Sequence, residues 1–351
     1  MSSATGVNSS AASDVPDETR ARQQSWVQQL LGARATWIFL LDIALIVLFT
    51  SLSRNGVFLS FLNLKSLLLS GTEMLLLALG LSMLLGAGKF DLSLGANLVL
   101  SSICGALAMV YLKSSGAAPV IIIFAGLIGC VVCGAAVGAL NGVLVARFNI
   151  NSLIATLGML GVGGGMALVL TGNGQDITGF PPQLQAQFGL KTFGPFPLPA
   201  LVALGVAAVL WAVIQHTAFG RHTLGIGSSA VAAARVGLRV ERHIFILFVL
   251  AGALAGLAGF VDLAHFQTTV ISGHPNDALQ AVAAVVIGGT LMEGGRISII
   301  GTIWGVALAA ILQNGLVIIG VSSAYQLIAV GAVLIAAVGL DRLSAARRDA
   351  K

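Results

Sequence analysis

The sequence predicts an all-α, polytopic membrane protein of about ten transmembrane helices, with both termini on the cytoplasmic side. Three observations support this fold class. Hydrophobic residues make up 57% of the 351 residues and charged residues only 9%, with a mean hydropathy of +0.98, a balance that suits a membrane protein and not a soluble domain. Apolar runs long enough to cross a bilayer recur along the chain. Lys and Arg gather in alternate connections between these runs.

The N-terminal region, 1–35, is expected to be a cytoplasmic tail. Its first residues, to about residue 22, are polar and lack apolar periodicity, which is typical of disorder. Trp26, Val27 and Leu30 fall at helical spacing among Gln and Arg, so a short helix lying in the membrane interface is predicted before the first span. The first long apolar run begins only near Thr36, which does not fit a secretory signal, and it is counted as a span.

The predicted transmembrane domain covers 36–341, and residues 342–351 form a second cytoplasmic tail. The eighth span is short and rich in Gly, so it is expected to be a broken or re-entrant helix. With both termini inside, fourteen of the 18 Lys and Arg residues lie inside, as the positive-inside rule requires. The spans are predicted at 36–53, 66–87, 92–112, 119–146, 152–172, 197–216, 243–264, 279–292, 298–320 and 324–340.

Several features between and within the spans have structural consequences. The outer connection, from about Gly172 to Pro199, contains five prolines, which exclude a continuous helix and favour a stiff, folded-over surface. A partner could bind there, or the segment could be a simple connector. Glycines four residues apart inside two spans should let helices approach closely; they are Gly134 with Gly138 and Gly252 with Gly256.

One long polar segment, about 219–243, separates two spans in the C-terminal half. Its four arginines (Arg221, Arg235, Arg239 and Arg242) place it in the cytoplasm. Ser228 or Ser229 can cap a short helix through the alanines at 232–234, which should stop at Gly237. A short helix on the cytoplasmic face suits a docking surface, although an ordinary basic loop would have the same charge.

Two glycine-rich stretches interrupt apolar runs in the two halves of the chain. Residues 86–95 and 287–298 each contain several glycines and one acid, after which the apolar run resumes. Interrupted helices in both halves of a transporter are the usual indication of its translocation region.

Four groups of residues recur in the order of a known family pattern: Gly88, Asp91, Leu92, Ser93 and Gly95; Asn141–Val145 and Ile154–Gly158; Gly220, Arg221, Ile226, Gly227, Ala233, Ala234, Gly237 and Leu238; and Val285–Thr290, Gly294, Gly295 and Ser298. Together they resemble the ribose-type sugar permeases, the membrane subunits of bacterial ATP-binding-cassette (ABC) importers. The similarity extends over residues 66–340. It departs from the family pattern at Lys89, which replaces a glycine, and at Ala278 and Gln280, which replace acids.

The resemblance implies a multi-pass protein of the bacterial inner or plasma membrane that forms the pathway for a sugar or sugar-like solute. Its implied partners are an ABC ATPase subunit, a soluble binding protein outside, a second permease and the lipid bilayer. This chain would be no enzyme and would bind no cofactor, because ATP and Mg²⁺ would sit on the ATPase. The residues that would couple the chain to the ATPase are Gly220, Arg221, Gly225, Gly227, Ala233, Ala234, Arg235 and Gly237. The residues that would lie near the pathway or its hinges are Asp91, Ser93, Gly95, Asn141, Thr156, Gly288, Gly289 and Thr290.

A rival interpretation is a stand-alone, ion-coupled secondary transporter that uses Glu73 or Asp42, because acids within spans often serve ion coupling. Asp91 and Asp262 are expected near span ends, within reach of water. A membrane scaffold without transport has no need of interrupted helices.

The net charge of +5 is explained by topology, so no nucleic-acid partner is expected. The sequence contains no phosphate-binding G-x-x-x-x-G-K-[ST] loop, and its five histidines show no metal-ligand spacing.

Overall fold

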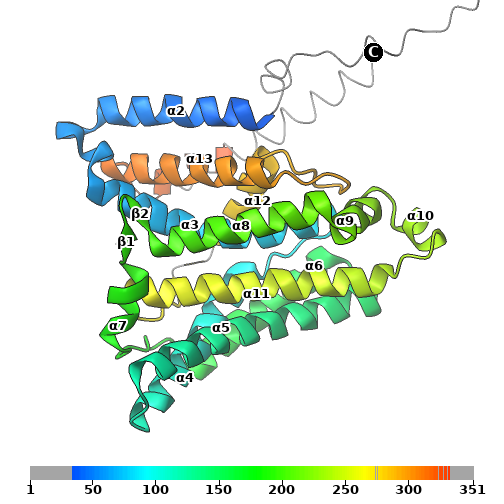
Figure 1. The fold of residues 1–351 in the computed structure, drawn as a ribbon, viewed down its shortest axis with the longest axis horizontal. Helices are drawn as coiled ribbons and strands as arrows, with labels where there is room; N and C mark the ends of the chain where they lie inside the picture. Colours follow the sequence, from blue (N-terminus) through cyan, green and yellow to red (C-terminus); the bar gives the residue numbers. More distant parts are fainter. Residues whose placement is uncertain are drawn as a thin grey trace, which may run out of the picture.

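The computed structural model describes residues 34–332, except 273, 275, 323, 327 and 330. In this part the chain is a bundle of long helices with one short β-hairpin (Figure 1). In chain order its elements are α2 (Arg34–Leu52), η2 (Arg54–Leu59), α3 (Phe61–Gly86), α4 (Leu94–Ser114), α5 (Pro119–Gly142), η3 (Val143–Arg147), α6 (Ser152–Leu170), α7 (Pro182–Leu184), η4 (Gln185–Gly189), β1 (Thr192–Phe193), β2 (Phe196–Pro197), α8 (Leu198–His216), α9 (Ala218–Ser228), α10 (Ala230–Arg235), α11 (Val240–Phe266), α12 (Asp277–Ile287) and α13 (Ile299–Ile318).

The predicted all-helical membrane fold is confirmed in its coarse form. Seven helices among the described residues are long and apolar enough to cross a membrane: α3, α4, α5 with η3, α6, α8, α11 and α13. The apolar part of α2 and the whole of α12 are shorter. The predicted interfacial helix, both tails and most of the span at 324–340 lie outside the described residues.

Helices α3 and α11 form the centre of the bundle. Along α3, the side chains of Leu76, Leu79 and Leu84 are fully buried, and Phe248 on α11 is buried with them. Residues 75–86 of α3 are mostly apolar and are all buried, as expected for a helix segment in the interior. By contrast, α5 exposes large apolar side chains such as Phe124 at 59%, as expected for a helix that faces lipid.

The contact between α5 and α11 is built from the glycines that the sequence indicated. A Cβ atom added to Gly134 would lie 2.3 Å from the carbonyl oxygen of Gly252, and one added to Gly252 would lie 2.2 Å from that of Gly134. Gly138 and Gly256 approach α11 and α5, respectively, just as closely. The backbones of the two helices therefore touch, and only glycine leaves room for this approach.

We expect Gly252→Ala to destabilise the protein by about 1–3 kcal/mol, because the added methyl group must push α5 away from α11. The midpoint of thermal unfolding in mild detergent measures the effect. Gly205→Ala in α8 is the matched control, because nothing lies within 4 Å of its added Cβ. An equal midpoint for the two variants would contradict the close helix contact.

The predicted span at 279–292 is wrong in its length. Helix α12 begins at Asp277 and ends at Ile287 after 11 residues, which at 1.5 Å per residue is about half of the hydrocarbon thickness. Gly289, Gly294 and Gly295 have φ of +92°, +95° and +81°, so the chain turns there instead of continuing as a helix. The expectation of a broken helix therefore agrees with the structure.

The two ends of the bundle carry different kinds of connection (Figure 1). At one end lie α7 and the hairpin β1–β2, which form the proline-rich connection, and at the other lie α9 and α10. The ammonium group of Lys65 donates to the carbonyl oxygen of Leu190 at 2.9 Å and ties α3 to the proline-rich connection. This connection is folded back on the bundle, as its prolines predicted.

The polar segment 219–243 is largely helical, which corrects the expectation of a loop with one short helix. Helix α9 covers its first half, and α11 already begins at Val240. The hydroxyl oxygen of Thr217 caps α9 by accepting from the backbone N–H of Gly220 at 3.4 Å. Three glycines within α9 lower its helix propensity, and tertiary packing overrides that preference.

Candidate functional site

The segment between α3 and α4 is held by a buried polar network. The carboxylate of Asp91 accepts hydrogen bonds from the backbone N–H of Ser93 at 2.9 Å and from its hydroxyl at 2.6 Å. The amide of Asn141, at the end of α5, donates to the Ser93 hydroxyl at 2.8 Å and to Asp91 at 3.3 Å. On α6, the hydroxyl of Thr156 accepts from the backbone N–H of Leu92 at 3.1 Å. Four residues predicted as pathway or hinge therefore meet in one place.

Asp91 is fully buried, so the expectation that water reaches it is wrong. Helices α5 and α6 cover the chain at this point, although the residue is close to the end of a helix in sequence. Burial raises the pKa of Asp91 to about 6, and the hydrogen bonds from Ser93 and Asn141 oppose that rise. The carboxylate is thus mostly ionised at neutral pH and is held by donors that would be lost if the network opened.

A second contact joins three motifs through glycine backbones. The N–H of Gly295 donates to the carbonyl oxygen of Gly86 at 2.9 Å. A Cβ atom added to Gly227, near the end of α9, would lie 1.9 Å from that same oxygen and 2.5 Å from the nitrogen of Gly295. The Cα atom of Gly227 also lies 2.8 Å from the position of a Cβ atom on Gly294. The two glycine-rich interruptions therefore touch each other and α9 at one place, which we name the glycine contact (Gly86, Gly227, Gly294 and Gly295).

The predicted residues after α12 shape its turn into α13. A Cβ atom on Gly288 would lie 2.5 Å from the carbonyl oxygen of Gly301, so α12 and α13 approach closely there. Gly289 needs its positive φ. The hydroxyl of Thr290 accepts from the backbone N–H of Ser298 at 3.0 Å and closes the turn. Gly95 lies elsewhere, with its added Cβ 2.9 Å from the carbonyl oxygen of His274.

The residues predicted to couple to an ATPase divide into two groups. Gly220 and Ala233 are buried, and with Gly227 they fix α9 and α10 to the bundle. The hydroxyl of Ser229 caps α10 by accepting from the backbone N–H of Ala232 at 3.2 Å, as predicted. The second group is exposed and consists of Arg221, Gly225, Ala234, Arg235 and Gly237.

Helix α10 also exposes apolar surface. Val231 is 65% exposed, and Val236, which follows the helix, is 78% exposed. Gly237 then ends the helix with a φ of +87°, as the sequence indicated. The α10 region therefore presents two valines and Arg235 to the surroundings, while Ala233 packs against the bundle.

A cavity of about 790 Å³ lies between α3, α12 and α13. The sequence indicated two of its polar residues, Glu73 as a candidate for ion coupling and Gln280 as a departure from the family pattern, and did not indicate the others. Its lining includes the side chains of Ser70, Glu73, His274, Asn276, Asp277, Gln280, Gln313 and Asn314. The size and mixed polarity of the cavity suit a small polar solute.

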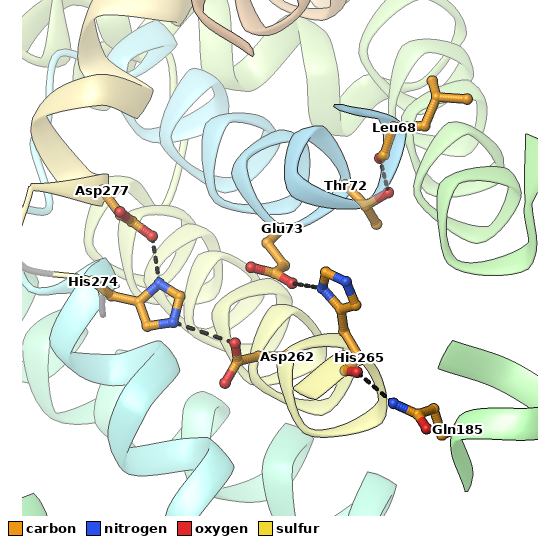
Figure 2. A network of polar contacts seen from close by, with 8 residues as sticks. All are labelled: Leu68, Thr72, Glu73, Gln185, Asp262, His265, His274 and Asp277. Atoms are coloured by element: carbon orange, nitrogen blue, oxygen red, sulfur yellow. Dashed lines mark hydrogen bonds and ion pairs between the residues drawn. The ribbon is translucent and has the colours of Figure 1, made fainter. Parts of the chain in front are cut away.

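Beside this cavity, three acids and two histidines form a cluster, which we name the acid–histidine cluster (Glu73, Asp262, His265, His274 and Asp277). Figure 2 shows these side chains converging from α3, α11 and the start of α12. Nδ1 of His274 lies 2.7 Å from a carboxylate oxygen of Asp277, and Nε2 lies 3.4 Å from Asp262. Nδ1 of His265 lies 3.6 Å from Glu73. Asp262 is fully buried, which corrects its expected place in water.

Although burial alone would lower the pKa of His274, its contacts with Asp262 and Asp277 raise it to about 10. A protonated His274 would therefore be a counter-ion for these acids at neutral pH. No sequence motif indicates the cluster, because its members come from separate segments that only the fold brings together.

The other acid of the rival interpretation, Asp42, is buried in α2 at 2% exposure. Among the described residues, neither of its carboxylate oxygens has a hydrogen-bond partner. It lies outside the acid–histidine cluster and the cavity lining.

A bundle of membrane-length helices with glycine-rich interruptions in both halves is the usual architecture of a transporter. The chain belongs to the family described as "Branched-chain amino acid transport system / permease component", whose model matches residues 63–338. It is therefore a multi-pass membrane permease of the ABC importer class, and the family assigns it the permease component of the system and not the ATPase.

Three curated relatives illustrate the family. The chain is 38% identical over 293 residues to the ribose import permease protein RbsC of Bacillus subtilis, covering 83% of this chain and 88% of the relative. It is 32% identical to the D-allose transport system permease protein AlsC of Escherichia coli, with 85% and 89% covered. It is 31% identical to the autoinducer 2 import system permease protein LsrD of Photorhabdus laumondii, with 88% and 92% covered. No solved structure matches the chain.

Proposed function

We propose that this chain forms the membrane pathway of an ABC importer for a sugar or sugar-like solute that a soluble binding protein delivers from outside. Support for the substrate class comes from the relatives, which are named for ribose, D-allose and autoinducer 2. The cavity beside α12 also supports this substrate class, because it is lined by amide, hydroxyl and carboxylate groups, which can form hydrogen bonds with the hydroxyl groups of a sugar.

The glycine contact is the observation that carries the proposed mechanism. It joins the end of α9 to both glycine-rich interruptions without an intervening side chain. A movement imposed on α9 and α10 must therefore displace the C-terminal end of α3 and the turn after α12, because backbones in direct contact cannot move independently of one another. In this mechanism α9 and α10 bind the ATPase subunit, which holds ATP and Mg²⁺.

The proposed orientation places α9 and α10 in the cytoplasm and the proline-rich connection outside. The exposed arginines near α9 and α10 satisfy the positive-inside rule. Four cations are predicted outside, which are Arg54, Lys65, Lys113 and Lys191. Two of them, Lys65 and Lys113, donate to carbonyl oxygens of the proline-rich connection. In this orientation both chain termini are cytoplasmic, a second permease completes the pathway, and the binding protein docks on the opposite face.

We propose that the Asp91 network is a hinge rather than a solute contact. Asp91, Ser93 and Asn141 hydrogen-bond one another, and Thr156 accepts from the backbone N–H of Leu92 beside them. All four side chains are buried, so even the unpaired amide oxygen of Asn141 is out of reach of a passing sugar in this state. The network fixes the interrupted segment to α5 and α6 in one state. Transport requires the two states to differ in such contacts.

The test of the proposed function is reconstitution in vesicles with an ABC ATPase subunit and a sugar-binding protein of the same system. We expect a tagged chain to retain the ATPase in near-equal amount in mild detergent. Uptake of labelled ribose, D-allose or autoinducer 2 should then require ATP and persist without an ion gradient. Uptake by the chain alone, driven by a proton or sodium gradient, would favour the rival carrier that uses Glu73 or Asp42 and would refute the importer.

A further inference from the structure

The geometry of the acid–histidine cluster points to a binding site for a divalent transition-metal ion, with Zn²⁺ as the best fit, held by Glu73, Asp262 and His274. One ligand atom from each of these three residues lies within 4.8 Å of the others. The residues come from α3, from the end of α11 and from the segment before α12, so an ion there would join three parts of the bundle (Figure 2).

The first support is a set of buried atoms without hydrogen-bond partners. Both carboxylate oxygens of Asp262, Oε1 of Glu73 and Nε2 of His274 are buried and make no hydrogen bond among the described residues. The side chain of Asp262 is only 1% exposed and that of Glu73 only 10%. Two carboxylates in such a place require a compensating positive charge, and a divalent cation balances both.

The second support is the distance between the facing atoms. Nε2 of His274 and Oδ1 of Asp262 are 3.4 Å apart, whereas a charge-assisted hydrogen bond between them would be about 2.7–2.9 Å. Two ligands on one tetrahedral zinc ion, each about 2.1 Å from the metal, lie about 3.4 Å apart. The carboxylate of Glu73 needs a shift on the order of 1 Å to complete the set.

The third support is the orientation of His274. Its Nδ1 lies 2.7 Å from Asp277, a normal hydrogen bond, while Nε2 faces Asp262 at the longer distance. A histidine that binds a metal through one ring nitrogen commonly donates the other N–H to a carboxylate, which fixes the ring and its tautomer.

The identity of the ion follows from the ligand set. One imidazole and two carboxylates suit Zn²⁺ and its neighbours in the transition series, whereas Mg²⁺ and Ca²⁺ prefer oxygen ligands alone. Glu73 and His274 also line the cavity, which gives the ion a route from solution and leaves room for a water molecule as a fourth ligand.

Metal analysis of the full-length protein tests the site. The chain, carrying a tag without histidines, is purified in mild detergent, stripped with a chelator, incubated with Zn²⁺ and desalted. We expect about one zinc per chain to be retained, and Co²⁺ as a probe should give the strong visible absorption of a low-coordinate site. Asp262→Asn and His274→Gln should each lower the retained zinc at least tenfold.

Two further variants separate metal loss from misfolding. Asp42→Asn removes another buried carboxylate and should retain zinc like the wild type. Asp277→Asn, whose side chain is 24% exposed, should keep the fold and weaken zinc binding by about 10–100-fold. A wild-type protein that retains no more zinc than Asp262→Asn, or equal retention by every variant, would overturn the proposal in favour of a protonated His274 between the acids. Sugar uptake is measured separately, so this result leaves the proposed function untouched.

Discussion

Gly227→Val is expected to reduce ATP-driven uptake by at least about tenfold while the permease remains in the membrane. The valine side chain would occupy the place of the carbonyl oxygen of Gly86 and the backbone nitrogen of Gly295. The glycine contact must then separate, because backbone atoms cannot move aside as a flexible side chain does. Helices α9 and α10 would keep their own structure but lose their direct connection to the two interruptions.

The control for this prediction is Gly205→Val in α8, which lies outside the residues assigned to ATPase coupling. Gly205 is exposed, and nothing lies within 4 Å of its added Cβ atom. Both variants replace a glycine within a helix by valine, so a difference in uptake reports the contact at Gly227 and not the type of substitution. Uptake and ATP hydrolysis are measured together in vesicles. Normal uptake by Gly227→Val at equal membrane content would remove α9 from the coupling mechanism.

Asp91→Asn is expected to destabilise the protein by about 1–3 kcal/mol and to impair uptake. The carboxylate accepts from Ser93 and Asn141 and donates nothing. An amide in its place directs an NH₂ group at one of these donors, so at least one buried hydrogen bond is lost. Because the network ties the interrupted segment to α5 and α6, the loss should also loosen the hinge.

Asp176→Asn is the control for Asp91→Asn, since Asp176 is exposed in the proline-rich connection. The midpoint of thermal unfolding and the initial rate of uptake are measured for both. A variant at Asp91 that unfolds at the wild-type midpoint would show that the network does not hold the segment. A lowered midpoint with full uptake would keep the network as a structural feature and remove its role as a hinge.

The sequence predicted the features that depend on composition and local pattern. Long apolar runs, the positive-inside distribution and the small-residue pairs of α5 and α11 indicated a helical membrane bundle with close helix contacts, and the structure confirms both in the described residues. A cap at Ser228 or Ser229 and a stop at Gly237 were predicted as well, and the structure has the cap at Ser229. These features depend on residues within a few positions of one another, which a sequence pattern can show.

Other features were mispredicted because local pattern and tertiary packing disagree. The three glycines of α9 favour a loop, yet α9 is a helix, and two of these glycines, Gly220 and Gly227, pack against Ile214 and Gly86. Asp91 and Asp262 lie near helix ends, a position that indicates contact with water, but neighbouring helices cover them completely. Helix α12 ends earlier than its apolar run because the following glycines adopt positive φ.

By itself, the sequence determined the membrane class, most of the long helices and the four motifs that resemble the sugar permeases. Only the tertiary structure decided that the motifs meet in the glycine contact and the Asp91 network, and that Glu73, Asp262 and His274 converge beside a cavity. The physical reason is that hydropathy and capping are local properties, whereas a buried polar site is made by segments far apart in the chain. Which segments lie close together depends on how the helices pack, and no spacing between residues in the sequence indicates it.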